Sequence, residues 1–179
     1  LIVPKIGDTT TSTSEDRLAD VVTWDATIAA RLGSLGSGMS LDFDGTDDEG
    51  DTPDSADHSF GDGAVDQPFS VVALVNPDVV NTEKHILGKF NTTSSLREWA
   101  FKIDGNGYPG LVLYDQSASA SLEREDATAL TVGSWVLLCA TYDGSRADTG
   151  ITVYKDGVAV DDAGGSSGSY TAMENLTEK

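Results

Sequence analysis

Short hydrophobic runs alternate with polar, glycine-rich stretches along most of the chain. β-Branched and aromatic residues are frequent in these runs, and Gly, Asp, Asn and Ser separate them. Many short runs with turn residues between them predict an all-β fold, either a sandwich or a barrel. The predicted strands are 1–6, 19–24, 40–43, 68–75, 85–90, 99–103, 111–114, 134–142, 151–155 and 158–160.

Two of the predicted strands are apolar on both faces. In 68–75 the odd-numbered positions from 69 onward are apolar, and so are Val72 and Leu74 on the other face. The segment 134–142 has the same character. A strand of this kind is expected in the middle of a sheet with both faces covered, or in a curved sheet.

Trp24, Trp135 and Cys139 are assigned to the core. Both tryptophans fall in predicted strands, where most aromatic side chains are buried. Cys139 is the single cysteine, so it forms no internal disulfide, and its apolar neighbours favour a small buried side chain.

Turns and one helix complete the local prediction. Asp156-Gly157 lies between β-rich flanks, which favours a type I′ hairpin because both turn residues need positive φ. A second tight turn is predicted over 104–107. One short helix is predicted near 26–32, and the Gly/Ser-rich segment 33–38 follows it as a flexible joint.

From Met39 onward a series of motifs follows in a fixed order. They are Leu41–Asp48, Pro53–Ser55, Phe69–Pro77, Ile86–Lys89, Leu130–Ser145 and Val153–Val158. This order resembles the concanavalin A-like, laminin-G-like jelly-roll family. The resemblance implies a two-sheet antiparallel β-sandwich, or jelly roll. One position departs from it: the family's second strand would include Glu49-Gly50, both poor strand formers, so we expect a short or irregular strand there.

The resemblance also suggests that the order of the chain is rearranged. Residues 1–32 resemble the family's C-terminal strands and helix, and 39–179 resemble its N-terminal and central strands. Three explanations stay open: circular permutation with 33–38 joining the old termini, a cut from a tandem array, or coincidence. The first is favoured because sandwich termini often lie close together. It makes 1–179 a single jelly-roll domain.

The charge of the chain excludes several partners. Its formal net charge is −19, which disfavours nucleic acid and anionic membrane surfaces. No apolar run has the length of a membrane span, so no membrane insertion is expected.

A carbohydrate site would need aromatic platforms with hydrogen-bonding groups beside them. The sequence offers a set of five candidates in two neighbouring predicted strands and the turn between them, although aromatic residues at strand spacing are more often core residues. The candidates are Trp99, Asp104, Asn106, Tyr108 and Tyr114.

Acidic residues crowd the stretch from Asp42 to Asp54, and carboxylates at this density could hold a structural Ca²⁺. The spacing does not match an EF-hand, and a solvated acidic loop is the alternative. Jelly rolls that this chain resembles often carry calcium near the paired termini. The resemblance therefore makes Asp44 and Asp47 the ligands, with Asp20 and Asp25 beside them.

Catalysis is not expected. Glu123 and Glu125 would share one face of a strand, as the carboxylates of a glycosidase could, but Arg124 separates them and a solvated edge explains them better. Fold resemblance alone does not justify an enzyme.

The resulting prediction is a non-catalytic binding module that recognises a glycan or a protein surface, of phage-virion or bacterial-surface origin. The alternative is a structural or assembly module, or an engineered permuted scaffold, without a small-molecule ligand. A glycoside hydrolase ranks below both. The expected location is extracellular or on a virion, with no signal peptide visible in this chain.

Overall fold

The computed structural model describes residues 23–24, 40–45, 48–91 and 94–177. The described chain divides into two compact units, one up to Asp54 and one from Ser55 onward. The first unit contains a two-stranded ladder of β1 (Thr23–Trp24) and β2 (Gly50–Asp51). The two-residue length of β2 confirms the short strand expected at Glu49-Gly50.

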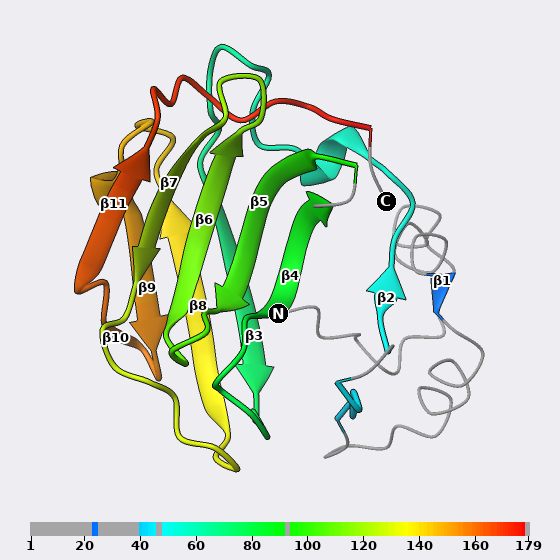
Figure 1. The fold of residues 1–179 in the computed structure, drawn as a ribbon, viewed down its shortest axis with the longest axis vertical. Helices are drawn as coiled ribbons and strands as arrows, with labels where there is room; N and C mark the ends of the chain where they lie inside the picture. The colour runs from blue at the N-terminus through cyan, green and yellow to red at the C-terminus, as the bar shows by residue number, and fades with distance from the viewer. Residues whose placement is uncertain (1–22, 25–39, 46–47, 92–93, 178–179) are drawn as a thin grey trace, which may run out of the picture. The chain divides into compact units, whose positions relative to one another are not determined.

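The second unit is a β-sandwich of two antiparallel sheets (Figure 1). The four-stranded sheet has the order β10-β9-β8-β3, and the five-stranded sheet has the order β11-β7-β6-β5-β4. The strands of the first are β3 (Phe69–Val75), β8 (Val136–Tyr142), β9 (Ile151–Lys155) and β10 (Val158–Ala159). Those of the second are β4 (Lys84–Asn91), β5 (Leu96–Ile103), β6 (Pro109–Asp115), β7 (Ala120–Glu125) and β11 (Ala163–Ser167).

The fold class predicted from the sequence is therefore confirmed. Within the described ranges the only helical segments are two 3₁₀ turns, Ala56–His58 and Asp148–Gly150. The predicted helix at 26–32 and the predicted strand 1–6 lie outside the described residues, as does most of the predicted strand 19–24. None of the described helices is both long and apolar enough to cross a membrane.

The core lies between the two sheets and follows the two-residue period of the strands. Phe101, Leu111 and Leu113 face inward from one sheet, and Leu138 and Ile151 face inward from the other, all fully buried. Alternate positions on every one of these strands therefore face away from the core, and those outward faces are where a ligand could bind.

One strand escaped the sequence prediction, and one predicted strand is absent. β11 has the sequence Ala-Gly-Gly-Ser-Ser, which has poor β-propensity, but it pairs with β7 over five residues. β7 was expected as an acidic strand, and the structure confirms it over Ala120–Glu125. Residues 40–43 form no strand. β11 is a strand because the fold places it beside β7, whereas residues 40–43 are not paired in a ladder.

The four-stranded sheet corrects the expectation about 68–75. β3 is the last strand of this sheet among the described residues, and its outward side chain Leu74 is 54% exposed. Trp135 precedes β8 and is also 54% exposed, so its assignment to the core is wrong. Cys139 faces outward and is only partly buried. In the described part of the chain, the apolar residues on the outward face of β3 are exposed, so they do not mark a strand covered on both sides. β8, in contrast, lies between β9 and β3 within its sheet.

The predicted hairpin is confirmed. Asp156 and Gly157 connect β9 to β10 with φ angles of 51° and 81°, the positive values that a type I′ turn requires. The turn at Asp104 is confirmed as well, since the Gly107 amide donates to the Asp104 carbonyl at 3.0 Å.

Buried carboxylates bind the segment 170–176, which has no strand of its own. Asp66 accepts hydrogen bonds from the Met173 amide at 2.7 Å and the Tyr170 hydroxyl at 2.8 Å. Asp115 accepts from the Thr171 amide at 2.9 Å, and Glu98 from the Leu176 amide at 2.6 Å. Three of these four bonds satisfy backbone donors that no neighbouring strand would satisfy.

Candidate functional site

The outward face of the five-stranded sheet carries most of the polar chemistry of the sandwich. Lys102 on β5 and Tyr114 on β6 alternate with the core residues Phe101 and Leu113. Glu123 and Glu125 occupy the outward face of β7, because Leu122, which precedes them, faces the core. We call this surface, with Glu83, His85 and Phe90 at its β4 edge, the polar face.

Lys102 links two acidic side chains across the polar face. Its Nζ lies 2.9 Å from Glu83 Oε2 and 3.0 Å from Glu123 Oε1, and the side chain is only 11% exposed. Burial alone would lower the pKa of Lys102. The two carboxylates raise this pKa by more than burial lowers it, so the net pKa lies well above its usual range. Burial alone would raise the pKa of Glu83. The contacts with Lys102 and His85 lower this pKa by more, so the net pKa of Glu83 is lowered.

Three rings form a cluster beside this ion network. The His85 and Phe90 rings meet edge to face with centroids 4.5 Å apart, and the Phe90 and Tyr114 centroids are 5.2 Å apart. The Arg97 guanidinium lies 4.9 Å from the centre of the Tyr114 ring, and Arg97 Nε donates to Gln116 Oε1 at 2.8 Å. The cluster combines an apolar ring surface with a cation over one of the rings.

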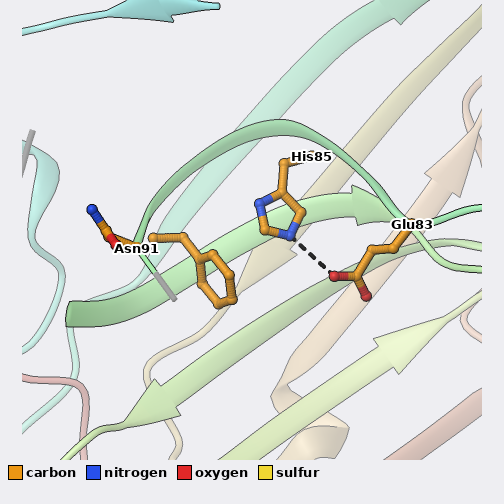
Figure 2. A pocket seen from close by; sticks show the side chains of 4 residues that line it. Glu83, His85 and Asn91 are labelled. Atoms are coloured by element: carbon orange, nitrogen blue, oxygen red, sulfur yellow. Dashed lines mark hydrogen bonds and ion pairs between the residues drawn. The ribbon is translucent and has the colours of Figure 1, made fainter. Parts of the chain in front are cut away.

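A first hollow opens at the β4 edge of the polar face (Figure 2). It has a volume of about 400 Å³ and is lined by Glu83, His85, Phe90 and Asn91. His85 Nε2 lies 3.3 Å from Glu83 Oε1, so the carboxylate orients the imidazole at the mouth of the hollow. The hollow therefore offers one aromatic wall and several hydrogen-bonding groups.

A second hollow lies at the β11 edge of the same face. Its volume is about 280 Å³, and it is lined by Ser121, Glu123 and Glu125 of β7 and by 163–167 of β11. The pKa of Glu125 is raised by burial and by the nearby charges of Glu123 and Asp104, which outweigh Lys102. The second hollow is therefore locally acidic, with a glycine-rich wall.

The predicted sugar-binding residues are divided by the structure. Trp99 is 5% exposed, packs against Phe60 and Phe69, and donates from Nε1 to the His58 carbonyl at 2.9 Å. Because this ring lies inside the sandwich, it cannot serve as a platform for a sugar, and that part of the prediction is wrong. Tyr114 does lie on the polar face, in the ring cluster.

The other three predicted residues form the β5–β6 turn. Asp104 Oδ1 accepts hydrogen bonds from the Asn106 and Tyr108 amides, both at 2.8 Å, and Asp104 Oδ2 accepts from Asn106 Nδ2 at 2.8 Å. Burial alone would raise the pKa of Asp104, but these hydrogen bonds lower it by more, so the net pKa of Asp104 is lowered. The three side chains line neither hollow, and what they do with a ligand stays a prediction.

Four residues of the polar face were missed from the sequence: Glu83, His85, Phe90 and Lys102. Lys102 carried a signal, because a charged residue between Phe101 and Ile103 in an apolar strand needs a partner. Glu83, His85 and Phe90 carried no such signal in the sequence, because their contacts depend on the pairing of β4 with β5.

The acidic pair on β7 is placed differently from the expectation. Glu123 and Glu125 do share a face, but β7 lies between β6 and β11, so the pair is not at a solvated edge. Arg124 points to the other side, where it lies 3.7 Å from Asp148 and 3.4 Å from Asp161. The carboxylates are therefore part of the polar face rather than of a sheet edge.

Only one of the four predicted calcium ligands is described. The Asp44 amide donates to Asp48 Oδ2 at 3.0 Å, an arrangement within one loop. Asp47, Asp20 and Asp25 lie outside the described residues. In the part of the chain that the structure describes, no group of three or more His, Cys, Asp or Glu side chains is placed to hold a metal ion. Calcium binding stays a prediction.

The fold and the polar face together define a class: an antiparallel β-sandwich with a polar, partly aromatic surface on one sheet. A family model described as the concanavalin A-like lectin/glucanases superfamily, of the laminin-G type, matches residues 44–176, and the chain belongs to that family. No curated protein and no solved structure matches the chain.

Proposed function

We propose that the chain is a non-catalytic binding module that recognises glycans through the polar face. The observation that carries this proposal is that Lys102 links Glu83, which contacts His85 of the ring cluster, to Glu123, and that each of these two carboxylates lines a hollow. Sugars bind to such surfaces because their C–H faces pack on rings while their hydroxyls bond to carboxylates, amides and imidazoles.

The family description supports this proposal, because it names lectins together with glucanases. It supports a carbohydrate- or surface-binding module, and it names neither a particular glycan nor an origin. Our proposal places the module on a bacterial surface or a phage particle, where an acidic, extracellular domain of this family would meet glycans.

The test is a glycan array followed by calorimetry of the strongest ligand. Phe90→Ala removes the ring between His85 and Tyr114, and we expect at least a tenfold loss of affinity, about 1.4 kcal/mol. Tyr154→Ala is the matched control, because Tyr154 is an aromatic residue on the outward face of β9 in the other sheet. An array without ligands, or equal losses in both variants, would overturn the proposal.

Hydrolysis of the bound glycan is the outcome that would overturn the non-catalytic part. Glu123 and Glu125 supply two carboxylates on one face, and a glycosidase needs two carboxyl groups about 5–10 Å apart that flank the bond. New reducing ends released by the wild type, and lost in Glu125→Gln, would show an enzyme. We expect none to be released.

A second candidate function, an assembly module, is favoured by the outward face of the four-stranded sheet. Leu74 and Leu137 are paired in register there, with exposed fractions of 54% and 39%. Exposed apolar side chains that adjoin one another are typical of protein–protein interfaces. If this face joins copies of the chain, light scattering will show dimers that Leu74→Lys converts to monomers.

A further inference from the structure

A buried lysine and a buried glutamate meet at one end of the sandwich, away from the polar face. Lys89 Nζ lies 3.0 Å from Glu98 Oε1, and the two side chains are 6% and 0% exposed. Lys89 pairs in register with Trp99, which faces the core, so Lys89 points to the inner side of β4. The register shift after Lys89 leaves Glu98 as the extra residue of a β-bulge, a feature that re-aims side chains.

The chain after β11 brings an amide side chain to this buried pair. The Leu176 amide donates to Glu98 Oε1 at 2.6 Å, which fixes the backbone next to Asn175. The Ser59 hydroxyl contacts all three side chains. Lys89 Nζ donates to it at 2.7 Å, and it lies 3.2 Å from both Glu98 Oε1 and Asn175 Oδ1. One hydroxyl therefore holds an amine, a carboxyl and a carboxamide together.

The two oxygens of Glu98 have unequal surroundings. Oε1 accepts hydrogen bonds from Leu176, Lys89 and Ser59, whereas Oε2 is buried without a hydrogen-bond partner among the described residues. An unsatisfied buried carboxylate oxygen is costly and calls for an explanation. Burial raises the pKa of Glu98, and the hydrogen bonds it accepts do not fully offset that effect. Glu98 is therefore suited to take up a proton.

Aromatic rings border these polar groups on the core side. Ser59 precedes Phe60 and Glu98 precedes Trp99, and the two ring centroids are 5.6 Å apart. Phe69 stacks on Phe60 with centroids 4.1 Å apart. An amine in apolar surroundings beside a carboxylate gives up its proton more readily than one in water, and the neutral amine is a nucleophile.

We propose that Lys89 and Asn175 become joined by an isopeptide bond, formed between Nζ and Cγ with Glu98 as the proton acceptor. This modification is independent of glycan binding. It fastens the chain after β11 to β4 by a covalent bond, at the end of the sandwich where buried carboxylates already hold that segment.

The atoms of the reaction balance without a co-reactant. Lys89 enters as an ammonium, and Glu98 takes one proton from Nζ as a general base. The Nζ lone pair forms a bond to Asn175 Cγ, and the Ser59 hydroxyl can donate to Oδ1 as negative charge develops there. The bond from Cγ to Nδ2 then breaks. Nδ2 takes the second Nζ proton and the proton held by Glu98 and leaves as ammonium, and nothing is oxidised or reduced.

The experiment measures the intact mass of the denatured protein and maps its peptides. We expect the wild type to be lighter than its sequence by the mass of one ammonia. Digestion should release a branched peptide that contains both Lys89 and Asn175. Thermal unfolding should give a lower melting temperature for Asn175→Ala than for the wild type, because a cross-link restricts the unfolded chain.

Three variants should have the full mass of their sequences: Lys89→Met, Asn175→Ala and Glu98→Gln. Asn175 is exposed as a whole residue, so Asn175→Ala should fold even where a change at a buried position does not. Lys84→Met is the matched control, because Lys84 is an exposed lysine on the same strand. The control should still lack one ammonia.

Each other outcome contradicts the proposal. A wild type with the full mass of its sequence would overturn it. An ammonia loss that survives in Lys89→Met or Asn175→Ala would also overturn it, because an asparagine that cyclises on its own backbone releases ammonia too. Loss of one water instead of ammonia would mean that Lys89 is joined to Glu98, and a full cross-link in Glu98→Gln would refute the role of that carboxyl. None of these results bears on glycan binding.

Discussion

The outward faces of the two sheets have opposite chemistry, although both sheets bury the same kind of inner face. On the five-stranded sheet the outward side chains form ion pairs and ring contacts, from Glu83 through Lys102 to Glu123. On the four-stranded sheet Leu74 and Leu137 are exposed, and neither hollow lies on that side. The five-stranded sheet therefore presents paired charged groups to solvent, and the four-stranded sheet presents exposed apolar side chains.

The contrast shows which observation points to a ligand. Single exposed apolar residues are common on protein surfaces and need no function to explain them. A nearly buried lysine between two carboxylates is uncommon, because its desolvation must be compensated. The network on the polar face therefore carries more information about function than the exposed leucines do.

The largest expected change in stability comes from a substitution on the inward side of β8, compared with one on its outward side. Leu138 is fully buried and Leu137, its neighbour on β8, is 39% exposed. Leu138→Ala should lower the free energy of unfolding by about 2–5 kcal/mol, because it leaves a cavity in the core. Leu137→Ala should cost less than about 1 kcal/mol, since solvent fills its place. Urea unfolding of both variants measures the difference, and equal losses would contradict the assignment of faces.

Removal of the cation should weaken the polar face by a smaller amount. Breaking a fully buried ion pair costs about 3–5 kcal/mol, but Glu83 and Glu123 are 50% and 35% exposed. Solvent screening reduces the expected loss for Lys102→Met to about 1–2 kcal/mol. Lys84→Met, an exposed lysine on β4, is the control and should change stability little. A loss as small as the control's would show that the network does not stabilise the fold.

The pH dependence should have opposite signs for two carboxyls of the polar face. The pKa of Glu125 is raised by burial and by Glu123, so its ionised form opposes folding. Glu125→Gln should therefore stabilise the protein at pH 7 by a few tenths of a kcal/mol, about the size of one exposed charge contact. This advantage should shrink as the pH falls through the raised pKa and vanish below the unfolded value of about 4.3.

Glu83 provides the opposite case. Its pKa is lowered because Lys102 and His85 outweigh burial, so its ionised form stabilises the fold. Glu83→Gln should destabilise at pH 7, and the difference from wild type should disappear as the pH falls through the lowered pKa. Urea midpoints at pH 7 and pH 3 test both variants, and changes of the same sign would contradict the charge assignment.

The smallest effect is expected at the exposed apolar face. Leu74→Thr introduces a β-branched residue that suits a strand, and it should change the free energy of unfolding by no more than about 0.5 kcal/mol. Chemical denaturation tests this expectation. A loss above about 1.5 kcal/mol would show that Leu74 is covered in the folded protein and that the two outward faces are less different than described.

The sequence predicted the elements whose signals are local. The β9–β10 hairpin followed from Asp156-Gly157, because the need for positive φ is a property of two residues. Strands with strong apolar alternation, such as 151–155, were also found. β11 was not, since Gly164-Gly165 favours no conformation and only the pairing with β7 makes it a strand.

The two tryptophans Trp99 and Trp135 show where the site prediction failed. Both lie in or next to apolar strands, yet Trp99 is 5% exposed and Trp135 is 54% exposed. Trp99 was predicted to contact a sugar and Trp135 to lie in the core, but the structure buries Trp99 and exposes Trp135. A two-residue period tells which residues share a face, but it does not tell which face meets the other sheet.

The sequence by itself determined the all-β class, the position of most strands, the tight turns, the acidic charge and the family resemblance. Each depends on neighbouring residues or on motif order. Only the tertiary structure decided that Glu83, Lys102 and Glu123 meet, because they come from a loop before β4, from β5 and from β7. Their contacts depend on strand order and register, which are fixed by packing between residues distant in the chain.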